Sequence, residues 1–267
     1  MYQTSLPKTL PTMYDLPSEN QKEPGLPDEF HLLQPELLRL TFRPPNYANE
    51  QIFTGSDLNL YYDPAHTQWY KRPDWFGVLG VSRLYQDQEL RLSYVIWQEK
   101  VSPFVAVELI SPGTEPEDLG KTLREVDQPP TKWQVYEQIL QIPYYFVFNR
   151  YTDELQAFHL VDNFYQTLII EDKGIWLPEA RLGLGLWRGS YQGINRLWLR
   201  WYDQQQNWVL TPAELGERRA EQEEHRAEQE KHRAERAEAF LQQERVVNQR
   251  LAQRLRELGV DPDTFYH

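Results

Sequence analysis

A seven-residue repeat near the C-terminus constrains the fold of this chain more than any other feature. It begins at Arg219 and reads RAEQEEH, RAEQEKH and RAERAEA in three successive heptads. The preceding segment TPAEL starts at Thr211 and offers a helix cap, a proline suited to the first turn and a glutamate three residues after the cap. We therefore predict a charged helical tail over residues 211–267, distinct from the rest of the chain.

The step of seven places one set of residues on a stripe of that helix. The resulting a positions are Ala220, Ala227, Ala234, Leu241, Asn248 and Leu255, and the d positions are Glu223, Glu230, Ala237, Glu244, Leu251 and Leu258. The C-terminal half of this pattern predicts a coiled coil and a homodimer, in which Asn248 sets the register. A solvated single helix held by charge pairs is an equal alternative, because three alanines bury too little apolar area to drive association.

The rest of the chain divides into two parts that differ in proline content and in the pattern of apolar residues. Residues 1–50 contain eight prolines, which favours an extended arm with one short helix near Pro35–Leu40. Residues 51–210 form an α/β domain, with a core helix at Thr131–Ile142 packed on one mixed system of strands. The expected strands are Leu58–Tyr62, Phe76–Leu79, Arg91–Gln98, Phe104–Ile110, Tyr144–Asn149, Glu154–Leu160, Tyr165–Ile170 and Leu197–Tyr202.

Composition excludes several classes of protein. Hydrophobic residues make up 40% of the chain and include nine Trp and sixteen Tyr, so a folded core is expected. The absence of cysteine excludes disulfides, thiolate metal sites and a cysteine nucleophile. No apolar run is long enough for a membrane span and no signal peptide is visible, so the expected compartment is the cytoplasm. The net charge of −12 argues against a general basic surface for nucleic acid.

Two acidic residues stand in strand-like sequence. Asp74 follows Pro73 at the entry to one apolar run, and Glu108 lies inside another, FVAVELISP. Strand alternation places Val105, Val107 and Leu109 on one face and Glu108 on the other, among apolar residues. A carboxylate in such a place is costly unless it is paired or binds a metal. Glu108 is therefore a site candidate, with a structural salt bridge to an arginine as the alternative.

Two carboxylates on adjacent strands suit a hard divalent cation such as Mg²⁺ or Mn²⁺. Phosphoester hydrolysis is the chemistry typical of that arrangement, and it calls for a lysine near the attacking water. Lys121 and Lys132 are both available, and Tyr136 lies one helical turn after Lys132 on the same face. For either lysine, a solvent-exposed surface position is the simpler explanation.

Five short segments occur in one order along the chain: Pro73-Asp74, VELISPGT from Val107, Asp118, Lys132-x-x-x-Tyr136, and IPYYFV from Ile142. This combination resembles the Uma-two family of endonucleases, which has the PD-(D/E)XK, restriction-endonuclease-like fold. The resemblance covers roughly Asn59 to Tyr165. The long variant of the family, with a helical tail rich in alanine and glutamate, is similar over most of the chain.

The resemblance implies a magnesium- or manganese-dependent endonuclease with DNA as its substrate. It implies that Asp74 and Glu108 are the metal ligands, with the carbonyl of Leu109 or Ile110 as a candidate third ligand. The superfamily pattern expects a lysine two residues after Glu108, where this chain has Ile110.

The resemblance therefore implies that the lysine of the superfamily pattern lies on the following helix in this chain. The spacing to Tyr136 matches Lys132 to the family's K-x-x-x-Y segment, and Lys121 stays the alternative. Tyr136 is included with the catalytic residues on the same spacing.

Three other functions remain open from the sequence. The first is a nuclease-fold module without catalysis, which binds or assembles through the helical tail; the acidic balance and the missing strand lysine favour it. A serine nucleophile at Ser111 lacks the glycine pattern of a nucleophile elbow and a histidine–acid pair. A glycosidase-like carboxylate pair would require a separation between the two carboxyl groups that the sequence does not give.

Overall fold

The computed structural model describes residues 10–12, 15, 28–110, 115–122 and 127–259. The chain forms two compact units, residues 1–211 and residues 212–267. The second unit contains the long helix α5 (Pro212–Glu257), along which no residue is buried. The first unit contains all the sheets and three clusters of buried hydrophobic residues.

The central layer of the first unit is a six-stranded mixed sheet. Its strands lie in the order β1 (Ile52–Gly55), β4 (Trp75–Leu79), β6 (Val105–Leu109), β7 (Tyr144–Asn149), β8 (Glu154–Val161) and β9 (Phe164–Thr167). The β6 and β7 strands are parallel, and the other neighbouring pairs are antiparallel. The helical connection between β6 and β7 returns the chain to the same end of the sheet, as a parallel pair requires.

Two smaller sheets flank this layer. One contains β10 (Ile175–Leu177), β11 (Leu182–Tyr191) and β12 (Ile194–Tyr202), and the other contains β3 (Tyr70–Lys71), β2 (Leu60–Tyr61) and β5 (Tyr94–Val95). The single sheet system expected from the sequence is therefore three sheets.

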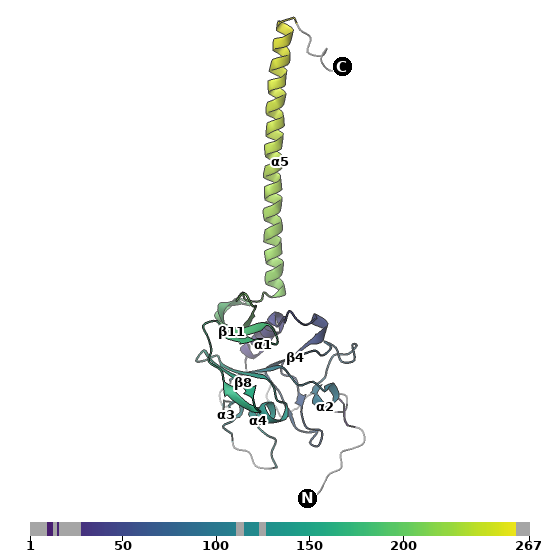
Figure 1. Cartoon of the computed structure of the whole chain (residues 1–267), viewed down its shortest axis with the longest axis vertical. Coiled ribbons are helices and arrows are strands. Elements are labelled where there is room, and N and C mark those ends of the chain that lie inside the picture. The colour runs from purple at the N-terminus through teal and green to yellow at the C-terminus, as the bar shows by residue number, and fades with distance from the viewer. Residues whose placement is uncertain (1–9, 13–14, 16–27, 111–114, 123–126, 260–267) are drawn as a thin grey trace. The chain divides into compact units, whose positions relative to one another are not determined.

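The two faces of the central sheet carry different cores. Helix α1 (Phe30–Thr41) and the β10–β12 sheet cover the face that presents Val105, Val107 and Leu109. Ala106 and Ile110 face the opposite core, together with Tyr136. Figure 1 shows the same arrangement, with α1 and β11 on one side of β4 and β8 and with α3 and α4 on the other. The alternation along β6 predicted from the sequence is confirmed.

Short helical segments complete the first unit. They are η1 (Asn49–Gln51), α2 (Ile96–Glu99), α3 (Glu115–Asp118), α4 (Lys132–Gln134) and a π-helical turn, η2 (Val135–Ile139). Thr131 caps α4, because its side chain accepts from the Gln134 amide while the Gln134 side chain accepts from the Thr131 amide. The core helix expected at Thr131–Ile142 is thus a brief α-helix that continues as a π-turn.

Two expectations about the N-terminal half need correction. The short helix near Pro35–Leu40 in a proline-rich arm of residues 1–50 is a twelve-residue helix, and its Leu37, Leu38 and nearby Phe42 are fully buried. Pro35 is tolerated in the second turn, and the apolar face makes α1 part of the domain. The strand expected at Arg91–Gln98 is only Tyr94–Val95 before the chain turns into α2.

Candidate active site

The site lies where β4 begins and β6 ends. Trp75 of β4 pairs with Val107 of β6, so one further step of the same register brings Asp74 beside Glu108. The Asp74 carboxylate accepts from the Leu109 amide at 2.6 Å, and the Asp74 amide lies 3.4 Å from Glu108 Oε2. Glu108 itself is completely buried. The two carboxylates that the sequence singled out therefore lie next to each other on adjacent strands.

Lys132 and Tyr136 reach the same carboxylate from the helical segment between β6 and β7. The Lys132 ammonium group lies 2.8 Å from Glu108 Oε2, and the Tyr136 hydroxyl donates to Glu108 Oε1 at 2.7 Å. Asp118 also pairs with Lys132, at 3.2 Å, and its backbone carbonyl accepts from the Tyr145 hydroxyl. The alternative explanation of Glu108 was a structural salt bridge to an arginine, but its ion-pair partner is Lys132.

Burial and excess negative charge govern the ionisation of the cluster. Burial raises the pKa of Glu108 to about 7, although Lys132 opposes the shift, and burial likewise raises the pKa of Asp74. Burial alone would lower the pKa of Lys132, but the charges of Glu108, Asp118 and Asp74 outweigh it and raise that pKa well above the usual range. One fixed ammonium group thus faces three carboxyl groups in a low-dielectric setting.

A histidine from the N-terminal half of the chain lies against this cluster. His31 of α1 is buried, with Nε2 3.1 Å from the Leu109 carbonyl oxygen and Nδ1 2.9 Å from an Asp28 carboxylate oxygen. Both partners are acceptors, so contacts on two sides hold the ring in place. The Leu109 carbonyl, implied by the resemblance as a third ligand, lies within hydrogen-bond distance of this ring. The sequence signal for His31 was weak, because 78 residues separate it from Leu109.

The remaining sequence candidates lie elsewhere. Lys121 is 61% exposed at its side chain and pairs with Glu115 at 3.1 Å, so the structure does not bring it to Glu108. Ser111, proposed and discounted as a nucleophile, lies outside the described residues.

The donor set fits a hard divalent cation held by few protein ligands. Mg²⁺ is commonly bound by one or two carboxylates and keeps several waters. Asp74 and Glu108 supply two adjacent carboxylates whose charge Lys132 offsets only in part. Within the described part of the chain, no group of three histidine or acidic side chains forms a more crowded metal cage.

A protein-family model independently matches this chain. The model is Uma2, described as "Putative restriction endonuclease", and it matches residues 16–189. The chain belongs to the Uma2 family. The match includes Asp74, Glu108, Lys132 and Tyr136, and it ends within β11. The family resemblance inferred from the sequence is confirmed.

No curated protein matches this Uma2 chain. A solved structure that it is similar to is a putative nuclease belonging to DUF820 from Anabaena variabilis ATCC 29413, with 10% identity and a TM-score of 0.39. That similarity covers 58% of this chain and 74% of the other. None of the helices in the described residues is both long and apolar enough to cross a membrane.

Proposed function

We propose that this Uma2 protein is a metal-dependent endonuclease that hydrolyses phosphodiester bonds of DNA. The observation that supports the proposal best is the junction of Asp74, Glu108 and Lys132 at the end of β6, with Glu108 hydrogen-bonded to Lys132. Membership of a family described as putative restriction endonucleases supports the nuclease class and DNA as the proposed substrate.

Asp74 and Glu108 would hold Mg²⁺ or Mn²⁺. When bound, the cation would act as a Lewis acid on a phosphodiester oxygen and lower the pKa of water beside it. Neighbouring groups position the two carboxylates: the Leu109 amide donates to Asp74, while Lys132 and Tyr136 donate to Glu108. Such preorganisation means that little rearrangement is needed when substrate arrives.

Lys132 carries the second part of the proposed mechanism. Its side chain is 20% exposed, whereas Glu108 beside it has no exposure, so the ammonium group lies between the buried carboxylate and solvent. From there it can orient an attacking water and offset the negative charge that develops on the phosphate. Tyr136 is a positioning residue in this scheme, since it contacts Glu108 on the buried side.

The proposal is tested by cleavage of supercoiled plasmid and of single-stranded DNA with Mg²⁺ or Mn²⁺. Asp74→Asn, Glu108→Gln and Lys132→Met are each expected to lower the cleavage rate by at least about a hundredfold. Lys121→Ala is the matched control, because that lysine is exposed and paired with Glu115, and the variant should cleave like the wild type. Melting profiles confirm that each variant is folded. Full activity of Lys132→Met would remove the lysine from the mechanism.

A second candidate function is assembly without catalysis, through α5. The C-terminal half of that helix exposes large apolar side chains, among them Phe240, Leu241 and Leu251 at 55–61%. Such side chains on a solvated helix are typical of a surface that pairs with another helix. Wild-type protein that cleaves neither DNA with either cation would favour this function over the nuclease.

A further inference from the structure

Two open cavities lie side by side between α1 and the edge strand β1, and both include Arg39 and Thr54 in their walls. We call them together the α1–β1 groove. One has a volume of about 380 Å³ and the other about 520 Å³. His31, Pro35 and Arg39 line the groove from α1 at a spacing of four residues, and Arg43 continues the same spacing just beyond the helix.

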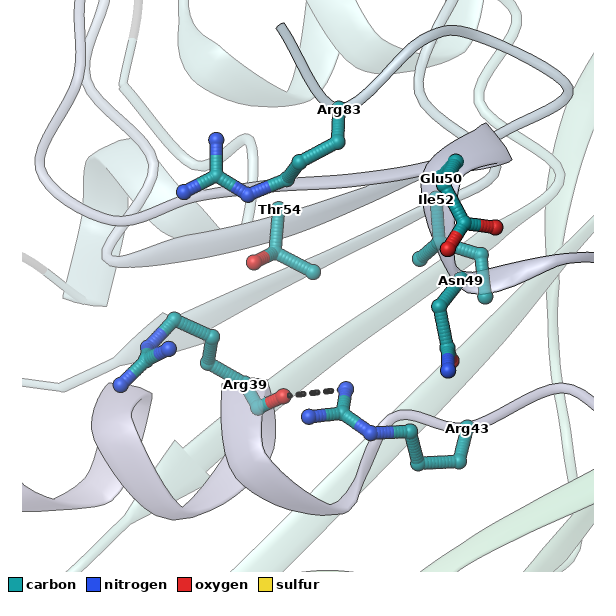
Figure 2. A pocket seen from close by; sticks show the side chains of 7 residues that line it. All are labelled: Arg39, Arg43, Asn49, Glu50, Ile52, Thr54 and Arg83. Atoms are coloured by element: carbon teal, nitrogen blue, oxygen red, sulfur yellow. Dashed lines mark hydrogen bonds between the residues drawn. The ribbon is translucent and has the colours of Figure 1, made fainter. Parts of the chain in front are cut away.

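Three arginines gather at one end of the groove. Arg39, Arg43 and Arg83 line the smaller cavity, and Figure 2 shows the guanidinium groups of Arg39 and Arg83 on either side of Thr54. In the described part of the chain, none of the three lies within salt-bridge distance of a carboxylate. Glu50 shares the cavity, but it lies beside Asn49 and away from those two guanidinium groups in Figure 2.

The positive charges of Arg39 and Arg43 repel each other. Arg43 donates to the Arg39 backbone carbonyl at 3.1 Å, which holds its guanidinium group near the helix. Partial burial, followed by the positive charge of Arg39, lowers the pKa of Arg43. Three cations in one open cavity without carboxylate partners form a site that an anion would stabilise.

The other end of the groove lies beside the backbone of the candidate active site, although Asp74, Glu108 and Lys132 line neither cavity. His31 lines the larger cavity, and its Nε2 contacts the Leu109 carbonyl, one residue after Glu108. Two acidic residues in this wall are already engaged: Glu36 accepts from the Tyr191 hydroxyl, and Asp57 pairs with Arg72 at 2.8 Å. Glu36 keeps its negative charge in that hydrogen bond, and Glu50 adds another, so the three arginines leave a positive excess in the groove that lies at the arginine end.

We infer that the α1–β1 groove binds the phosphate backbone of duplex DNA next to the bond that is cleaved. This inference rests on the proposed function, because the carboxylate cluster fixes where cleavage would occur. The twelve residues of α1 span about 18 Å. That length corresponds to about five base-pair steps of B-DNA at 3.4 Å per step. Arg39, Arg43 and Arg83 thus contact phosphates several nucleotides from the cleaved bond, and they carry no sequence information.

The inference also explains how an acidic protein binds a polyanion. The net charge of −12 gives no general attraction for DNA, and residues 41–210 carry 15 basic against 21 acidic side chains. Arg39 lies outside that range, and Arg43 and Arg83 are 40 residues apart. Folding brings them together in one cavity.

The test is the affinity of the full-length protein for a fluorescent 30-base-pair duplex, measured in EDTA at several salt concentrations. The variant Arg39→Gln/Arg43→Gln/Arg83→Gln should bind at least about tenfold more weakly at 0.15 M salt, and its slope of log K against log salt should fall by about 2.7. The matched control is Arg219→Gln/Arg226→Gln/Arg233→Gln, three exposed arginines of α5 with the same change of net charge. The control should bind like the wild type.

Three results of this binding measurement would overturn the inference. They are an equal loss of affinity in both triple variants, an unchanged salt slope in the groove variant, and equally tight binding of polyglutamate, which would make the groove a general anion site. Arg83→Gln alone, outside α1, repeats the measurement if the triple variant does not fold, and is expected to lower the slope by about 0.9.

Cleavage assays separate this inference from the nuclease proposal. If the wild type cleaves DNA, the groove variant should have a raised KM and an unchanged kcat. Weaker binding by the groove variant in a protein that does not cleave would keep the groove and reject the nuclease. Cleavage with unaltered KM in the groove variant would keep the nuclease and reject the groove.

Discussion

Glu108 receives two different kinds of hydrogen bond, from the Lys132 ammonium group and from the Tyr136 hydroxyl. Only the first brings a charge, so the ionised carboxylate is compensated by one partner and merely oriented by the other. Asp74 lies close by and adds repulsion. The cluster therefore binds protons more readily than ordinary carboxylates do, and a divalent cation would replace those protons.

The first residue-level prediction concerns stability against pH without metal. The pKa of Glu108 is raised from 4.5 to about 7, so the folded state holds this proton more tightly than the unfolded state does. The stabilisation it gives is complete below about pH 4.5 and is lost as the pH rises through 7. Glu108→Gln cannot lose a proton. In EDTA, the melting temperature of the variant minus that of the wild type should therefore increase by about 2 °C or more between pH 5.5 and pH 8.5. A difference that stays constant with pH would contradict the shift.

The second residue-level prediction concerns the hydrogen bond from Tyr136 to Glu108. The tyrosine hydroxyl lowers the pKa of Glu108, so Tyr136→Phe should raise that pKa further. If the nuclease proposal holds, the acidic limb of the cleavage rate against pH should move to higher pH. Tyr94→Phe is the control, because it removes a hydroxyl that donates to the Val101 carbonyl in another part of the domain. An equal shift in both variants would mean that general destabilisation, and not Glu108, is responsible.

The sequence indicated some of these residues and could not indicate others. Glu108 is conspicuous because a carboxylate in an apolar strand is rare, and Lys132 with Tyr136 follows from spacing on a helix. His31 and Arg39 have no such local signal. Their positions depend on packing between α1 and β strands far away in the sequence, which periodicity does not encode.

At the scale of elements, an uninterrupted apolar run predicts the strand β7, whereas the glycine-containing run of β11 gives a weaker signal. β7 occupies the expected Tyr144–Asn149, whereas β11 was not expected. Gly185 explains the omission, since a Cβ at this position would lie 1.8 Å from the Lys173 carbonyl oxygen. Close backbone approach requires glycine there, although glycine weakens the strand signal. The π-turn η2 was likewise unpredictable from helical spacing, because α and π turns share similar apolar patterns.

The helix α5 gives an element-level prediction of association. Its C-terminal half exposes Leu241 at an a position and Leu251 at a d position, so we predict a homodimer through this half. Leu241→Glu/Leu251→Glu should shift the full-length protein to a monomer in light scattering after size exclusion. Ala220→Glu/Ala227→Glu, in heptads with glutamate at d, should leave the mass unchanged. A wild-type monomer at high concentration would favour the solvated single helix.

At the scale of the whole molecule, the buried core and the long helix α5 belong to different units. Every cluster of buried hydrophobic residues lies in residues 1–211, and α5 buries none of its own. Within the described residues, the buried apolar side chains that stabilise the sheets therefore belong to the first unit.

Removal of residues 212–267 tests this separation. The shortened protein should melt within about 3 °C of the full chain at equal low concentration, because it loses no buried side chain in the described structure. It should also keep the DNA affinity and the salt slope of the full chain, since the α1–β1 groove lies wholly in the first unit. A dimeric full chain and a monomeric shortened chain would place association in α5. A large fall in melting temperature at concentrations where the full chain is monomeric would instead show that the helix stabilises the domain, and that the two units are not independent.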